Sequence, residues 1–133
     1  METKPPTSRA MYWGGWVLSL LPTPLLLMGA VMKITNAPVV VEGFAKMGWP
    51  EGVAVTIGLI ELACTLLYLI PRTAVLGAIL LTGYLGGAIA THVQMGDAWY
   101  GPFAFGVVLW LGLFLRDHRV RALVPWRFPA STP

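Results

Sequence analysis

Hydrophobic residues fall into four long blocks, separated by short segments that carry the polar, glycine and proline residues. Each block holds roughly 17 to 22 residues, which at about 1.5 Å per helical residue matches the hydrocarbon thickness of a bilayer. Because backbone groups in lipid must be paired within their own segment, each block is expected to be a helix. The pattern predicts a single all-α domain, residues 1–133, folded as an integral membrane four-helix bundle. The predicted transmembrane helices cover residues about 11–32, 52–70, 73–93 and 99–115.

A shorter amphipathic pattern lies between the first two blocks, over residues about 37–47. Pro38 suits the first turn of a helix and Gly48 suits its end. Apolar side chains fall on one face of this helix, and Glu42 and Lys46, four residues apart, fall on the other. We therefore expect a short interfacial helix that lies flat on the membrane surface, over the bundle.

The composition agrees with a membrane protein: 56% of the residues are hydrophobic and 11% are charged, and the mean hydropathy is +0.71. A net charge of +3 indicates attraction to anionic lipid and gives no case for a nucleic-acid partner. The basic residues are divided unequally between the two predicted sides of the membrane, so the positive-inside rule places both termini, with the basic tail 116–133, in the cytoplasm. One side carries Lys4, Arg9, Arg72, Arg116, Arg119, Arg121 and Arg127, and the other carries Lys33 and Lys46. In the tail, Trp126 and Phe128 suit the headgroup region.

Glu61 stands in the stretch GLIELACTLL, nine residues from either end of the second block. That position is roughly 13 Å from each membrane interface, the most costly depth for a carboxyl group. Helical spacing places small and polar residues around Glu61 on one face, which must therefore point into the bundle. This predicted inward face consists of Ala54, Gly58, Cys64, Thr65 and Tyr68.

The third block offers a face that suits close packing against the second. Small residues recur there at every fourth position, which is the pattern of helices whose backbones approach closely in membranes. The recurring residues are Ala74, Ala78, Thr82, Gly86 and Ala90. We expect Gly58, Ala78, Gly86 and Ala90 to be helix-packing residues.

A different face of the third block carries Tyr84 and His92. Counted from the helix ends, Tyr84 is nearly level with Glu61, whereas Lys33 and His92 lie closer to the outer surface. These polar side chains predict a ladder that lines a cavity under the interfacial helix. The expected cavity or ligand-binding residues are Lys33, Glu61, Thr65, Thr82, Tyr84 and His92.

Two interpretations of Glu61 remain open from the residues. In one, Glu61 is protonated and accepts or donates a hydrogen bond with a Tyr84 or Thr82 hydroxyl, with no ion pair to Lys33 because the depth difference is too great. In the other, Glu61 ends a cavity that binds a polar headgroup or passes protons, and Glu61 and His92 are the candidate catalytic residues.

Several chemistries are excluded by residue counts and positions. Cys64 is the only cysteine, so one chain has neither a Cys-x-x-Cys pair nor an internal disulfide. His92 and His118 fall on opposite sides of the membrane and cannot both ligate one haem. No metal-ligand spacing or phosphate loop is present, so we expect no metal and no intrinsic cofactor. Pro22 and Pro24 predict a kink in the first helix, which we interpret as a packing feature.

The stretches GAVMKI, VVVEGFAKMGWPEG, GLIELACTLLYLIPRTAVLGAILL and GAIATHV together resemble the DoxX-like family of small four-helix bacterial membrane proteins. The resemblance covers roughly Gly29 to Val93, and the fourth helix matches only as a hydrophobic segment. It implies location in the bacterial cytoplasmic membrane. The motif positions that it implies are Lys33, Glu42, Gly48, Pro50, Glu61, Pro71, Arg72, Gly77, Thr91 and His92.

The founding relatives are associated with sulfur-compound and quinone redox complexes, in which they are membrane subunits. The resemblance therefore implies membrane lipids and other membrane-protein subunits as partners, and a bound quinone or lipid as the ligand. We expect a non-catalytic subunit of a larger complex that contributes packing and a lipid or quinone cavity. The alternative is a quinone-linked redox enzyme subunit in which Glu61 and His92 handle protons while a partner handles electrons.

Overall fold

The computed structural model describes residues 7–123, which form seven helices joined by turns, with no strand among them. The predicted all-α class is confirmed. The predictions for Lys4, Trp126, Arg127 and Phe128 lie outside the described residues. In chain order the helices are α1 (Arg9–Leu20), α2 (Thr23–Ile34), α3 (Pro38–Lys46), α4 (Val53–Leu69), α5 (Ala74–Met95), α6 (Tyr100–Arg116) and α7 (His118–Leu123).

Two helical segments are long and apolar enough to cross a membrane, namely Arg9–Ile34, which comprises α1 and α2, and Ala74–Met95, which is α5. Helices α4 and α6 are apolar too but are shorter, at 17 residues each. Large hydrophobic side chains such as Leu25, Leu59 and Ile79 are exposed along the helices. Exposed apolar surface on this scale is unusual for a protein that folds in water.

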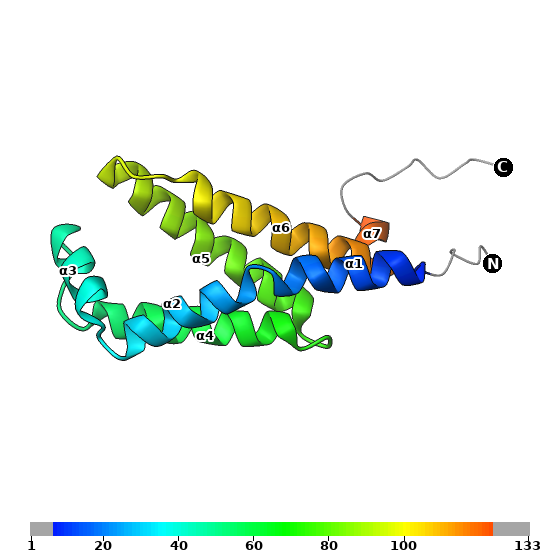
Figure 1. Cartoon of the computed structure of the whole chain (residues 1–133), viewed down its shortest axis with the longest axis horizontal. Coiled ribbons are helices and arrows are strands. Elements are labelled where there is room, and N and C mark those ends of the chain that lie inside the picture. Colours follow the sequence, from blue (N-terminus) through cyan, green and yellow to red (C-terminus); the bar gives the residue numbers. More distant parts are fainter. Residues whose placement is uncertain (1–6, 124–133) are drawn as a thin grey trace.

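The first long segment bends between α1 and α2, where Pro22 supplies no backbone N–H. The Thr23 hydroxyl donates to the Ser19 carbonyl at 2.7 Å and so pairs one of the groups near the bend. The bend changes the packing partner of the chain, because α1 lies against α6 whereas α2 lies against α4 (Figure 1). The kink expected from the prolines thus does more than adjust local packing.

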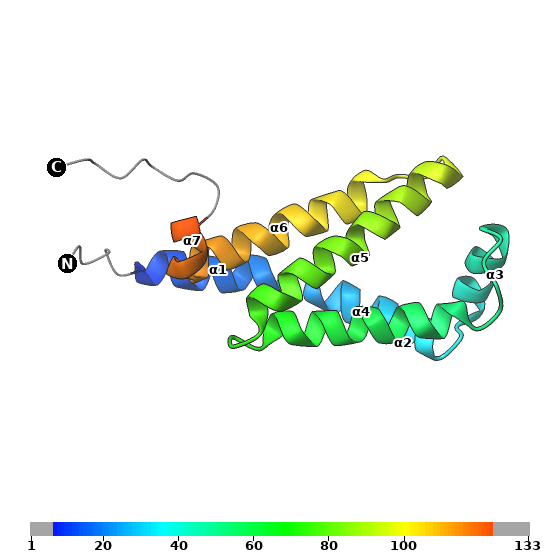
Figure 2. The same cartoon turned by 180° about the vertical axis from the view of Figure 1, so that it is seen from behind.

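The long helices form two arms that meet at one end of the molecule and diverge toward the other (Figures 1 and 2). Helices α5 and α6 make one arm, and α2 and α4 make the other. The arms join at the turn between α4 and α5, and α3 lies across the open end (Figure 1). The largest fully buried side chains include Tyr68, Leu81, Leu109 and Leu113, so the core lies toward the closed end.

Glycines allow the closest helix approaches near the closed end. A methyl group on Gly77 of α5 would fall against the backbone of Tyr68 in α4. At the crossing of α1 and α6, a methyl group on Gly15 would lie 2.7 Å from the Gly112 carbonyl oxygen. Since neither approach leaves room for a side chain, these backbones pack as directly as helices can.

The small-residue seam predicted on α5 is formed only in part. Ala74 and Ala78 are buried, but Thr82, Gly86 and Ala90 are exposed. A methyl group on Gly86 would meet no atom within 4 Å. The seam leaves α4 because a repeat of four residues drifts around a helix with about 3.6 residues per turn, so Thr82 and Gly86 face the side of α6 instead.

Gly58 is a packing residue with a partner other than the one expected. It lies against α2, where a methyl group would come within 2.7 Å of Lys33 Cβ and 2.9 Å of the Ala30 carbonyl oxygen. Gly58 therefore allows close packing of α4 against α2, and not against α5 as expected.

Candidate functional site

The buried face of α4 is the one predicted from helical spacing. Its buried residues are Ala54, Gly58, Glu61, Cys64, Thr65 and Tyr68. On the opposite side Leu59, Leu66 and Ile70 are exposed. The spacing of small and polar residues was sufficient here because all of them belong to one helix, whose period is known.

Glu61 forms an ion pair with Lys33 of α2, in which Nζ lies 2.8 Å from Oε2. The Lys33 ammonium also donates to the Gly29 carbonyl at 3.3 Å. The Glu61 side chain is 5% exposed and that of Lys33 is 18% exposed. The expectation that no ion pair forms between these residues was wrong.

Lys33 reaches Glu61 because two glycines clear its path. A methyl group on Gly29 would lie 3.3 Å from both Lys33 Nζ and Glu61 Oε1. Gly58 leaves similar room for the base of the lysine side chain. The long side chain of Lys33 can therefore run back along α2 and cover the depth difference that had argued against the pair.

The two hydroxyls expected beside Glu61 have different surroundings. Tyr84 of α5 is half-buried and approaches the Glu61 carboxylate from the opposite arm. Thr82 lies on the side of α5 that faces α6, where it donates to the Ala78 carbonyl and accepts from Trp110 Nε1, each at 2.7 Å. Of these two hydroxyl groups, only that of Tyr84 lies near the Glu61 carboxylate.

Thr65 lies one helical turn beyond Glu61, and its hydroxyl donates to the Glu61 backbone carbonyl at 2.7 Å. It is fully buried. Its hydroxyl is therefore paired within its own helix and does not donate to the carboxylate.

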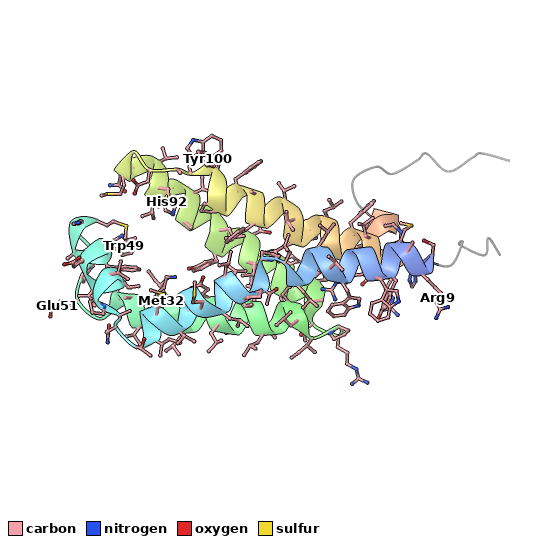
Figure 3. All side chains as sticks on the ribbon, viewed as in Figure 1. Arg9, Met32, Trp49, Glu51, His92 and Tyr100 are labelled. Carbon is pink, nitrogen blue, oxygen red and sulfur yellow. The ribbon has the colours of Figure 1, made fainter. Side chains whose placement is uncertain are left out.

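A cavity of about 560 Å³ lies between the two arms at the open end. Lys33, Tyr84, Thr91 and His92 supply much of its polar lining, and Glu61 lies behind Lys33. Figure 3 shows His92 on one arm and Trp49 near α3 on opposite sides of the opening. The structure thus brings three of the six expected cavity residues, Lys33, Tyr84 and His92, to one space.

A second hollow, of about 640 Å³, lies between α5 and α6 and was not foreseen. Its walls are almost entirely apolar, and Gly86, Gly106 and Phe103 contribute to them. Thr82 of α5 and Trp110 of α6, which share a hydrogen bond, also line this hollow.

A buried polar cluster at the closed end was missed by the reasoning from sequence. The Tyr68 hydroxyl lies 2.6 Å from the Leu109 carbonyl oxygen and 2.9 Å from the Ser19 hydroxyl. Arg116 donates to the Tyr68 carbonyl at 3.3 Å, and its guanidinium carbon lies 4.0 Å from the centre of the Trp16 ring. Within residues 7–123, the Arg116 Nε atom is buried and has no hydrogen-bond partner.

Arg116 had been assigned to the basic cytoplasmic tail, yet the structure buries its side chain among α1, α4 and α6. One signal could have indicated its burial. Gly112, in the fourth block, lies four residues before Arg116, so a helix that continues to Arg116 places the arginine on the face that Gly112 opens to close packing.

The other candidate chemistries concern cysteine, histidine and metals. Cys64 is a free, buried thiol. His92, near the end of α5, and His118, at the start of α7, lie at opposite ends of the molecule (Figures 1 and 3). In the part of the chain that the structure describes, no three His, Cys, Asp or Glu residues form a group that could hold a metal ion.

Residues 17–115 match the DoxX-like family. The chain belongs to the DoxX-like family. The match begins within α1 and ends within α6, so it includes the ion pair, the cavity and the fourth hydrophobic block, which by residue motifs alone had matched only in hydrophobicity. No curated protein and no solved structure matches the chain. Family membership and the two apolar helices of membrane-spanning length identify this DoxX-like protein as a helical membrane protein.

Proposed function

We propose that this DoxX-like protein is a non-catalytic subunit of a larger membrane complex, to which it contributes a cavity for a lipid or a quinone. The observation that carries this proposal is the Lys33–Glu61 ion pair beside an apolar cavity of about 560 Å³. Charged groups within a membrane are costly, and they commonly mark binding sites or proton pathways. A cavity with apolar walls and one charged end suits an amphiphilic ligand.

The proposed topology places four spanning segments in the bilayer: α1 with α2, then α4, α5 and α6. The closed end of the molecule carries Arg9, Arg72, Arg119 and Arg121, so by the positive-inside rule it is cytoplasmic. The cavity then opens toward the outer leaflet of the bacterial cytoplasmic membrane, beneath α3. In this orientation a ligand enters from the lipid between the diverging arms.

Two neighbouring glycines on α5 provide a test with a matched control. Gly87 lines the cavity, whereas Gly86 lines the apolar hollow on the other side. A methyl group would meet no atom within 4 Å at either position, so the side chain of Gly87→Leu and that of Gly86→Leu each begin in open space. The leucine at position 87 would occupy the ligand space.

Each tagged variant is purified in mild detergent from its native membrane, and both the bound amphiphiles and the co-purifying proteins are identified by mass spectrometry. We expect the wild type and Gly86→Leu to retain a bound lipid or quinone and a stoichiometric partner, and Gly87→Leu to lose the amphiphile. Retention of the same amphiphile by Gly87→Leu would contradict the cavity. A chain that always purifies without a partner would contradict the subunit role.

A second candidate function is a redox enzyme subunit in which Glu61 and His92 handle the protons of quinone chemistry. It is favoured by one observation: Tyr84 and His92 line the cavity, and Tyr84 approaches Glu61. Proton-bearing groups therefore extend from the opening toward the carboxylate. A co-purifying flavin, haem or iron–sulfur protein, together with quinone reduction that slows in Glu61→Gln, would support this function, whereas a colourless assembly would support the first.

A further inference from the structure

We infer that the cavity between the arms selects an uncharged head group, whose carbonyl oxygen accepts a hydrogen bond from Lys33. The inference rests on the proposed function of the cavity, and it specifies the class of ligand. It follows from the number of donors on Lys33, from the charges around the cavity and from the composition of its walls.

Lys33 has one N–H left to offer. An ammonium group carries three N–H donors and no acceptor. One donates to Glu61 Oε2 at 2.8 Å and a second to the Gly29 carbonyl at 3.3 Å. Lys33 lines the cavity, whereas Glu61 is more deeply buried behind it. The polar end of the cavity therefore presents a donor, and a ligand must bring the acceptor.

The charges around the cavity cancel. Lys33 is balanced by Glu61, and near the opening Lys46 and Asp97, which also line the cavity, carry opposite charges. These four charges give an anionic head group no net attraction, and such a group would lie close to the Glu61 carboxylate in surroundings of low dielectric constant. A cationic head group would meet the Lys33 ammonium first. An uncharged acceptor avoids both penalties.

The walls suit a flat or chain-like apolar body. Gly83, Gly87 and Ala88 line the α5 side, and Ile57 and Ile60 line the α4 side. A lipid-soluble molecule can therefore lie between the arms with its carbonyl group at Lys33. Two sources supply this chemistry, an acyl ester of a glyceride and a ring ketone of a quinone.

The test compares two ligands that differ only in a phosphate group. The full-length protein in detergent is mixed with equal amounts of monooleoylglycerol and oleoyl lysophosphatidate, and native mass spectrometry measures the ratio of the two complexes. We expect monooleoylglycerol to dominate in the wild type by about tenfold, because at the polar end of the cavity the phosphate would have to be desolvated beside a Lys33 ammonium that is already paired with Glu61.

Two variants test the role of charge balance. Glu61→Gln leaves Lys33 unbalanced, so the ratio should move toward lysophosphatidate by about tenfold or more. Glu42→Gln makes the same chemical change on the exposed face of α3, outside the cavity, and should leave the ratio unchanged. Addition of decylubiquinone distinguishes the two sources: displacement of monooleoylglycerol shows that a ring ketone can occupy the site, and no displacement restricts the site to esters.

The outcomes separate this inference from the proposed function. Preference for lysophosphatidate in the wild type, or an unchanged ratio in Glu61→Gln, would overturn the selection of an uncharged head group and leave the cavity in place. Failure of all three ligands to bind, in the wild type as in Gly87→Leu, would overturn the cavity itself. The wild-type comparison needs no variant, so it decides the question even if Glu61→Gln does not fold.

Discussion

At the residue scale, Lys33 and Glu61 determine how this protein places charge inside an apolar environment. The interpretation of Glu61 as a protonated hydrogen-bonding group required no cation nearby, yet the Lys33 ammonium is 2.8 Å away. A buried ion pair adds little stability compared with an apolar pair of the same shape, but removal of one partner leaves an uncompensated charge. The two residues should therefore depend on each other strongly.

A double-mutant cycle tests this dependence. We expect Lys33→Met and Glu61→Gln to destabilise the protein singly and the double variant to be more stable than the sum of their effects predicts, with a coupling of about 1–3 kcal/mol. Unfolding in detergent, followed by circular dichroism, gives the four free energies. The exposed pair Glu42 and Lys46 on α3 is the control and should show no measurable coupling. Additive effects at Lys33 and Glu61 would favour the protonated form of Glu61.

At the element scale, three pairs of helices approach closely at a glycine that is required by contact rather than by backbone conformation: α1 with α6, α2 with α4, and α4 with α5. At the crossing of α1 and α6, a methyl group on Gly112 would lie 2.8 Å from the Ser19 backbone nitrogen and 2.9 Å from the Gly15 carbonyl oxygen. On α5, by contrast, Gly86 faces open space. The glycines of this protein therefore differ in what they contribute, although the sequence pattern around them is similar.

We expect Gly112→Ala to destabilise the protein by about 1–3 kcal/mol, because the added methyl group must displace backbone atoms of α1. Gly86→Ala should be neutral or stabilise the protein by up to about 1 kcal/mol, since alanine is the better helix former and nothing obstructs it. Thermal unfolding of both variants in one detergent measures the difference. Equal stability of the two variants would show that α1 and α6 do not cross at Gly112.

At the scale of the whole molecule, the arginines and the cavity lie at opposite ends of the long axis. The closed end, which holds the α1–α6 crossing and α7, carries most of the arginines, and the open end carries the cavity. The proposed orientation therefore presents the opening to the outer leaflet and the arginines to anionic lipid on the cytoplasmic side.

This orientation predicts which cysteines an impermeant thiol reagent can reach in intact cells. Asp97→Cys, in the exposed turn between α5 and α6, should react from outside. Ser8→Cys, exposed just before α1, should react only after the cells are opened. The native Cys64 is buried and is replaced in both variants to remove background. Reaction of Ser8→Cys in intact cells would show that the N-terminus lies outside and that the proposed topology is wrong.

Features within one helix could be read from the residues with little error. The inward face of α4, the short α3 and the approximate bounds of the long helices agree with the predictions because helical period, proline position and bilayer thickness act locally. The placement of Lys33, Tyr84 and His92 around one space also followed from depth along the helices.

Features between helices could not be read in this way. After the bend at Pro22 the first segment changes its packing partner, because α1 packs against α6 and α2 packs against α4. No local sequence pattern indicates which helix will be the partner on either side of the bend. The Lys33–Glu61 pair depends on clearance at Gly29 and Gly58, and the burial of Arg116 depends on where α1 crosses α6. Periodicity predicts which side of a helix faces inward. The points at which helices cross, and the partners that a long side chain can contact, are determined only when the helices pack together.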